Sequence, residues 1–117
     1  MADTIAHLAL TKKAENILIM DIRKITSMTD YFIICSATTD IQVKAIADTI
    51  RKGTELKPWH MEGYQQLSWV LLDYVDVIIH IFTTESREYY ELERLWADAP
   101  VRELKDEPEN LLNPPTE

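Results

Sequence analysis

The sequence predicts one α/β domain, and three observations lead to this prediction. The chain has 117 residues, of which 46% are hydrophobic, so it is long enough for one domain with a real core. Two short runs rich in Val, Ile, Leu and aromatic residues, 67–72 and 77–82, are typical of strands. Other segments carry apolar residues at helical spacing. Strands that alternate with helices predict a sheet covered by helices.

The first part of the chain predicts one helix and two strands. Residues 3 to about 14 predict an amphipathic helix that Asp3 or Thr4 can cap. Strands are predicted at 16–22 and 31–35. The second of these is almost wholly apolar, which is typical of a strand in the interior of a sheet.

A second helix is predicted to begin near Thr39. Thr39 and Gln42 have the spacing of a capping box, in which each side chain bonds a backbone N–H at the start of the helix. Gly53 is positioned to end this helix in a left-handed conformation. The order strand, loop, helix predicts a crossover. A strand at 59–65, bent at Gly63, would then lie parallel to the strand before the helix.

The two apolar runs at 67–72 and 77–82 form the centre of the predicted sheet. The later run is apolar on both faces, so we expect a central strand covered on both sides. Alternation along the earlier run puts Trp69 on the same side as Asp73, with Tyr74 on the opposite side. Trp69 and Tyr74 are either core residues or anchors of a binding surface, and spacing leaves both interpretations open.

Residues 86–99 predict a third helix, which Pro100 ends. It has more apolar residues than one stripe requires, so it can pack on the sheet alone or also meet a partner or a second copy of the chain. We therefore assign residues 1–99 to the domain. Residues 100–117 hold four of the five prolines and five acids against two basic residues, which predicts an acidic, Pro-rich, poorly ordered tail.

The net charge of −8 argues against several classes of partner. Nucleic-acid binding depends on Lys and Arg that neutralise phosphates, so we expect no specific nucleic-acid ligand. An acidic domain is better suited to a basic protein surface. No apolar run approaches the roughly 18 residues of a membrane span, and the first residues have no signal-peptide or transit-peptide pattern. The single cysteine, Cys35, lies in an apolar run and predicts a buried thiol, so we expect a cytoplasmic protein.

Few residues have the spacing of a catalytic or cofactor site. Two glycines are too few for a phosphate loop or a dinucleotide fingerprint. The three histidines lack ligand spacing with Cys35, so we expect no structural zinc, and His80 predicts a hydrogen-bonded core histidine. The carboxylates of Glu62, Asp73 and Asp76 are the candidates for a divalent metal site, although Asp also favours turns for its own backbone bonds.

Several segments together carry a resemblance to a known family. They are 30–36 (DYFIICS), Gln42, 45–48 (AIAD), 62–63 (EG), 69–74 (WVLLDY), 76–82 (DVIIHIF) and 87–96 (REYYELERLW). In combination they resemble the ribosomal silencing factors, the Iojap-related proteins. The chain departs from the family at Val75, where relatives usually have Gly between Tyr74 and Asp76. A β-branched residue disfavours positive φ, so the turn at this position is either different or rearranged.

The resemblance implies a mixed sheet of about five strands flanked by helices, similar to nucleotidyltransferases in architecture. It also implies binding to the large ribosomal subunit through large-subunit ribosomal protein fourteen, at the face where the small subunit docks. The protein would then be a translation repressor that blocks subunit joining without catalysis, cofactor or metal. Relatives form homodimers, which the aromatic last helix also permits. The implied contact residues are Trp69, Asp73, Tyr74 and Asp76, and geometry adds Leu71.

The alternative is a metal-dependent enzyme of the nucleotidyltransferase type. In this hypothesis Glu62, Asp73 and Asp76 hold the metal ion. A Gly-Ser nucleotide loop and a paired Asp-x-Asp are both missing from the sequence, which argues against the hypothesis.

Overall fold

The computed structural model describes residues 1–90 and 99–104, with the backbone alone for 88–90, and residues 91–98 and 105–117 lie outside the described part. The described residues form three helices and six strands. In chain order these are α1 (Ala2–Thr11), β1 (Glu15–Asp21), β2 (Tyr31–Ala37), α2 (Asp40–Gly53), β3 (His60–Glu62), β4 (Trp69–Asp73), β5 (Val77–Thr83), α3 (Thr84–Tyr90) and β6 (Val101–Leu104).

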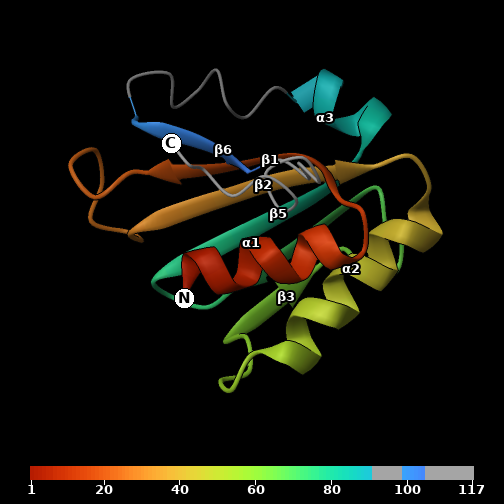
Figure 1. Cartoon of the computed structure of the whole chain (residues 1–117), viewed down its shortest axis with the longest axis horizontal. Coiled ribbons are helices and arrows are strands. Elements are labelled where there is room, and N and C mark those ends of the chain that lie inside the picture. Colours follow the sequence, from red (N-terminus) through yellow and green to blue (C-terminus); the bar gives the residue numbers. More distant parts are fainter. Residues whose placement is uncertain (91–98, 105–117) are drawn as a thin grey trace, which may run out of the picture.

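The six described strands form one mixed sheet in the order β3-β4-β5-β2-β1-β6 (Figure 1). β2 and β5 run parallel in the middle of the sheet, and every other neighbouring pair is antiparallel. β2 and β5 are mostly apolar and buried on both faces, as expected for inner strands. The predicted fold class, a mixed sheet flanked by helices, is confirmed.

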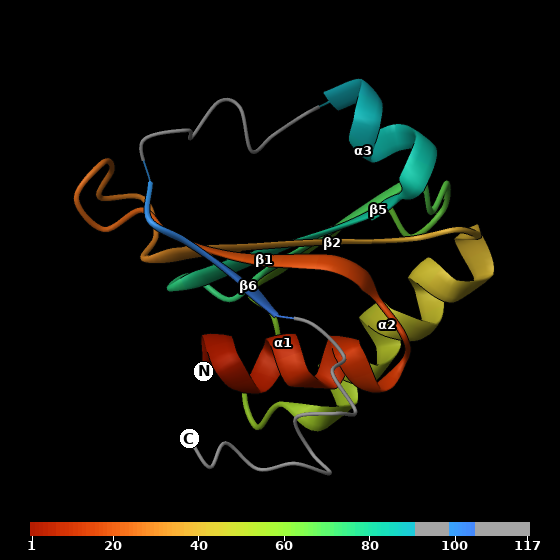
Figure 2. The ribbon, with the colours of Figure 1, turned by 45° about the horizontal axis from the view of Figure 1, so that its top comes forward.

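The helices lie on opposite faces of this sheet (Figure 2). α1 and α2 cover the first face, and α3 lies beyond the second face near one end of the strands. The larger core lies under α1 and α2. Its fully buried members include Ile17, Ile33, Ile46, Leu72, Ile79 and Ile81. The second face has a smaller buried cluster among the described residues, made of Met20, Ile22, Phe32, Ile34, Phe82 and Ala99.

β3 differs from the strand predicted at 59–65, and the predicted pairing is wrong. β3 lies at the edge of the sheet and pairs antiparallel with β4 instead of parallel with β2. The chain reverses at Gly63, which has a φ of +92° and accepts the N–H of Leu67 at 2.8 Å. A Cβ at Gly63 would lie 2.0 Å from the carbonyl oxygen of Trp69, so the turn requires glycine. β5, and not β3, pairs with β2 in the interior of the sheet, because β5 has two apolar faces to bury.

α1 begins before the two residues predicted to cap it. Its N-cap is Met1, which makes no side-chain cap hydrogen bond, so the prediction of Asp3 or Thr4 as the cap is wrong. Asp3 lies instead in the first turn, where a carboxylate interacts favourably with the helix dipole. Its Oδ1 accepts from Arg102 of β6 at 2.7 Å.

α2 keeps one half of the predicted capping box. Thr39 Oγ1 accepts the N–H of Gln42 at 3.2 Å, but the amide of Gln42 donates to the carbonyl of Lys12, just after α1, at 3.0 Å. The helix continues through Gly53 and ends in an extended conformation, so the predicted left-handed cap is wrong. Gly53 instead permits the approach of α1, because a Cβ there would lie 2.7 Å from Cδ2 of Leu8.

The end of the chain contributes a strand that we did not predict. Residues 101–104, expected to belong to a poorly ordered tail, form β6 and pair antiparallel with β1. α3 begins at Thr84, and Thr83 Oγ1 accepts the N–H of Ser86 at 3.3 Å. The predicted apolar face of this helix and its end near residue 99 fall largely on residues outside the described part.

Candidate functional site

Four half-buried side chains lie together on the second face of the sheet, where β4 pairs with β5. Trp69, Leu71 and Asp73 alternate along β4 and point to this face, opposite Phe82, His80 and Ile78 of β5 respectively. We call the group of Trp69, Leu71, Asp73 and Ile78 the β4–β5 patch. Each of the four keeps part of its surface accessible, in contrast to the fully buried Val70 and Leu72 between them.

Trp69 has a defined position within the β4–β5 patch. Its indole stacks on Phe82 with the ring centroids 4.9 Å apart, and its Nε1–H donates to Nδ1 of His80 at 3.1 Å. His80 is 6% exposed, and its ring meets Phe32 edge-on at 5.1 Å. Burial lowers the pKa of His80 to about 4. The prediction of a hydrogen-bonded core histidine is therefore confirmed.

The turn between β4 and β5 adopts the conformation that its sequence disfavours. Val75 has a φ of +77°, and the N–H of Asp76 donates to the carbonyl of Tyr74 at 2.9 Å across it. Asp73 Oδ1 accepts the N–H of Val75 at 2.8 Å, and Tyr74 N–H donates to Val77 at 2.9 Å. The turn thus has a positive φ of the kind that glycine adopts without steric cost, although Val75 is β-branched.

Tyr74 and Asp76, the other two predicted contact residues, lie in different environments. Tyr74 is 8% exposed and packs into the core of the first face, where its hydroxyl is 2.9 Å from Thr54 Oγ1. Burial raises the pKa of Tyr74, and the Thr54 hydrogen bond acts against this rise. Asp76 is exposed in the turn, and its carbonyl oxygen accepts the N–H groups of Asp30 and Tyr31. Strand alternation therefore separates Tyr74 from the β4–β5 patch.

The carboxylates proposed for a metal site do not come together. Glu62 lies opposite Leu71 across the β3–β4 pairing, and its Oε2 is 2.7 Å from Nε2 of His60. Asp73 uses Oδ1 for the N–H of Val75. The described residues contain no group of three or more Asp, Glu, His or Cys side chains arranged to hold a metal ion.

His60 and Ile78 border or belong to the patch, and sequence reasoning did not select either residue. His60 lies directly opposite Asp73, and Ile78 lies on the other side of Asp73. Their proximity follows from cross-strand pairing. The antiparallel pairing of 69–73 with 77–83 across a short turn is the signal that could have identified Ile78, whereas His60 depends on the β3–β4 pairing, which we did not predict.

Cys35 has the environment predicted for it. The side chain is fully buried on the first face, and burial raises the pKa of its thiol to about 12. The thiolate, which is the reactive form, is therefore scarce near neutral pH.

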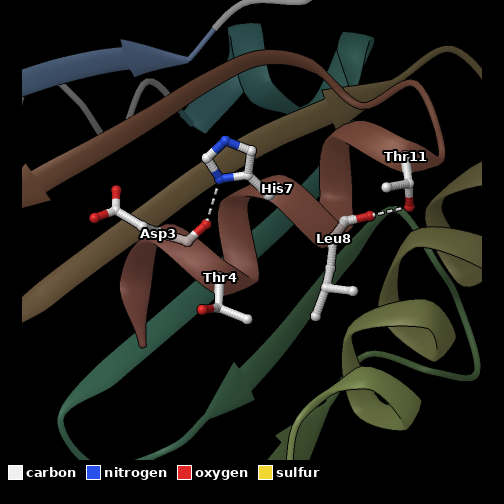
Figure 3. A pocket seen from close by; sticks show the side chains of 5 residues that line it. All are labelled: Asp3, Thr4, His7, Leu8 and Thr11. Atoms are coloured by element: carbon white, nitrogen blue, oxygen red, sulfur yellow. Dashed lines mark hydrogen bonds between the residues drawn. The ribbon is translucent and has the colours of Figure 1, made fainter.

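A hollow lies on the surface of α1 (Figure 3). It is lined by Asp3, Thr4, His7, Leu8 and Thr11. His7 Nδ1 is 2.8 Å from the carbonyl oxygen of Asp3, and the hydroxyl of Thr11 donates to the carbonyl of Leu8 at 2.6 Å. Both of these hydrogen bonds lie within α1, and the carboxylate of Asp3 is bonded to Arg102 of β6. Among the described helices, none has the length and apolar character needed to cross a membrane.

Comparison with known proteins identifies the family. The family model described as "Ribosomal silencing factor during starvation" matches residues 1–116. This chain belongs to the ribosomal silencing factor family. The ribosomal silencing factor RsfS of Bacillus subtilis is 44% identical over 98 residues, covering 80% of this chain and 81% of its own. RsfS of Halalkalibacterium halodurans is 42% identical over 99 residues, covering 80% and 83%.

Solved structures agree with this assignment at the level of the fold. A crystal structure of a protein from Chromobacterium violaceum superimposes with a TM-score of 0.79 at 27% identity, covering 82% of each chain. Membership of the silencing factor family implies association with the ribosome and a role in translation regulation.

Proposed function

We propose that this protein represses translation by binding the large ribosomal subunit through large-subunit ribosomal protein fourteen, which keeps the small subunit from joining. The observation that carries the proposal is the β4–β5 patch, where the half-buried Leu71 lies between Trp69 on the same strand and Ile78 diagonally across on β5. The proposal extends the family's silencing role to a particular surface of this chain.

The chemistry of the β4–β5 patch suits the centre of a protein interface. A large aromatic ring beside the aliphatic Leu71 supplies apolar area, and tryptophan at the centre of an interface carries a disproportionate share of the binding energy. In addition, the ring of Trp69 stacks on Phe82, which limits the orientations that the indole can adopt. Tyr74 is buried on the opposite face and contributes to the shape of the strand end instead of to the contact.

The charge around the patch favours a basic partner. Asp73, Asp76 and Glu62 stand at or near its edge, and the whole chain carries a net charge of −8. Asp73 uses one oxygen for the turn, which leaves Oδ2 to pair with a Lys or Arg of the partner. Long-range attraction speeds the approach to a basic ribosomal protein, and the same charge opposes binding to bare RNA.

The proposed mechanism is steric exclusion and involves no catalysis. An interface of about 800 Å² on each partner is enough for a stable complex. A domain bound at the face where the small subunit docks excludes that subunit by occupying its place. This mechanism needs no cofactor. We expect the protein to act in the cytoplasm, where the ribosomes are.

The test replaces one residue at the centre of the patch. Leu71→Arg puts a positive charge against the basic partner and should weaken co-sedimentation with purified large subunits by at least about tenfold. The same variant should no longer prevent purified small and large subunits from joining. Circular dichroism and thermal unfolding check that the variant keeps its fold.

Ile41→Arg is the matched control. Ile41 is 78% exposed at the start of α2, and α2 covers the face of the sheet opposite the patch, so the same change is made in a different element. This variant should bind and inhibit like the unmodified protein. Full-strength binding by folded Leu71→Arg, or equal loss by both variants, would contradict the proposed surface.

A further inference from the structure

The described residues of β5 contact Trp69 at two separate points of its ring system. Stacking on Phe82, with an angle of 29° between the rings, fixes the plane of the indole. The hydrogen bond from Nε1 to Nδ1 of His80 fixes which edge of the indole points toward β5. A stack alone would allow other rotamers about the Cβ–Cγ bond, since that torsion has broad minima. The bond to His80 selects one of them.

His80 is itself buried and closely packed, and its chemistry is unusual for a core position. It is 6% exposed and packs edge-on against Phe32. Because Nδ1 accepts the indole proton, the ring's own proton is on Nε2. Nε2 is buried and has no hydrogen-bond partner among the described residues. A buried polar group without a partner lowers stability, so packing alone would favour an apolar residue here.

Burial keeps this acceptor available at neutral pH. A protonated imidazole donates from both nitrogens and could not accept the Nε1–H of Trp69. Desolvation holds the pKa of His80 at about 4, so the ring is neutral under ordinary conditions. Nδ1 therefore stays an acceptor for Trp69 throughout the physiological pH range.

We infer that His80 is a positioning residue for the ribosomal contact: its Nδ1 holds the indole of Trp69 in the orientation in which the β4–β5 patch meets its partner. This inference rests on the proposed function. His80 is too deeply buried to touch a partner itself, so it acts through Trp69. A side chain that is ordered before binding loses less entropy when the complex forms, and the bond thus raises affinity without a new contact.

Two substitutions separate positioning from packing. His80→Asn keeps an oxygen acceptor near the position of Nδ1 but loses the ring. His80→Phe keeps an aromatic ring against Phe32 but loses the acceptor. If His80 positions Trp69, the Asn variant should match the unmodified protein in the Trp69 indole signal and in affinity, and the Phe variant should not. If His80 only fills space, the Phe variant should match the unmodified protein, and the Asn variant should not.

The first readout is the indole N–H signal of Trp69 in a nitrogen-15 NMR spectrum. The signal is assigned by its loss in Trp69→Phe, since the chain has three tryptophans. In His80→Phe we expect it to move toward the position of a solvent-exposed indole and to exchange faster with water. In His80→Asn it should stay near its original position. An unmoved signal in a folded His80→Phe overturns the inference, whatever happens at the ribosome.

The second readout is affinity for purified large subunits. His80→Phe should bind about five- to tenfold more weakly, which matches the cost of ordering one large side chain. His80→Asn should recover most of that affinity. If Trp69→Phe weakens binding but His80→Phe does not, the positioning role is overturned while the proposed function stands. If neither variant changes binding, the proposed surface itself is wrong, and the NMR result still decides whether His80 orients Trp69.

Discussion

Oδ1 of Asp73 accepts a hydrogen bond from the N–H of Val75 at 2.8 Å, and this bond closes the turn that joins β4 to β5. Val75 has a φ of +77° in this turn and is 54% exposed. A β-branched residue in this conformation is strained, and no burial of the side chain compensates for the strain.

Val75→Gly should therefore stabilise the protein. Glycine adopts positive φ without steric cost, and we expect a gain of about 1 kcal/mol in the free energy of unfolding after the extra freedom of the unfolded chain is counted. Urea unfolding monitored by circular dichroism measures it. Val101→Gly, at a half-exposed strand position without positive φ, is the control and should not stabilise. A loss of stability in Val75→Gly would show that the turn is not strained.

Asp76→Asn should slow association with large subunits and leave dissociation nearly unchanged. Asp76 is exposed beside the β4–β5 patch, and an edge charge acts mainly on the rate of encounter. We expect a decrease of about twofold at low salt that disappears as screening shortens the range of the charge. Stopped-flow binding at several salt concentrations tests this. Glu55→Gln, an exposed acid in the loop after α2, should have a smaller effect.

His80 should make the protein less stable in mild acid. Its pKa is lowered from 6.5 to about 4 in the folded state, so between these values the unfolded chain binds a proton that the folded chain does not. The free energy of unfolding is unaffected by His80 above about pH 6.5. It falls as the pH decreases and is lower by roughly 3 kcal/mol at pH 4. Urea unfolding across this range, compared with His80→Phe, isolates the effect because all other groups are shared. Parallel curves for the two proteins would contradict it.

Cys35 should be unreactive in the folded protein. Its thiol is buried and its pKa is raised to about 12, so both access and thiolate are lacking. Labelling with a thiol-specific reagent should be at least about a hundredfold slower than in denaturant, since it requires unfolding. Ser27→Cys combined with Cys35→Ala gives a control thiol at an exposed loop position, which should react quickly. Similar rates for the two thiols would mean that the core around Cys35 opens readily.

The elements with strong periodic patterns could be predicted from the sequence. The inner strand at 31–35 and the central strand at 77–82 carry long apolar runs, and these runs dictate burial on both faces. The N-cap at Thr39 was likewise predictable, because its chemistry is local. Such features depend on residues that are close in sequence.

Features that depend on distant residues could not be predicted. Gly53 resembles a helix end, yet its function is set by Leu8 of another helix. β6 has only four residues and is mostly exposed, so its pairing with β1 left little hydrophobic signal. In the candidate site, alternation correctly separated Trp69 from Tyr74. It gave no indication that Trp69 would bond His80 across the β4–β5 pairing.

β6 comes from the last part of the chain and covers the outer edge of β1. Until Val101–Leu104 has been synthesised, β1 presents its unpaired backbone groups as an open edge to any neighbouring chain. A nascent or truncated form that stops short of these four residues would therefore be prone to aggregation, even though its main core was complete.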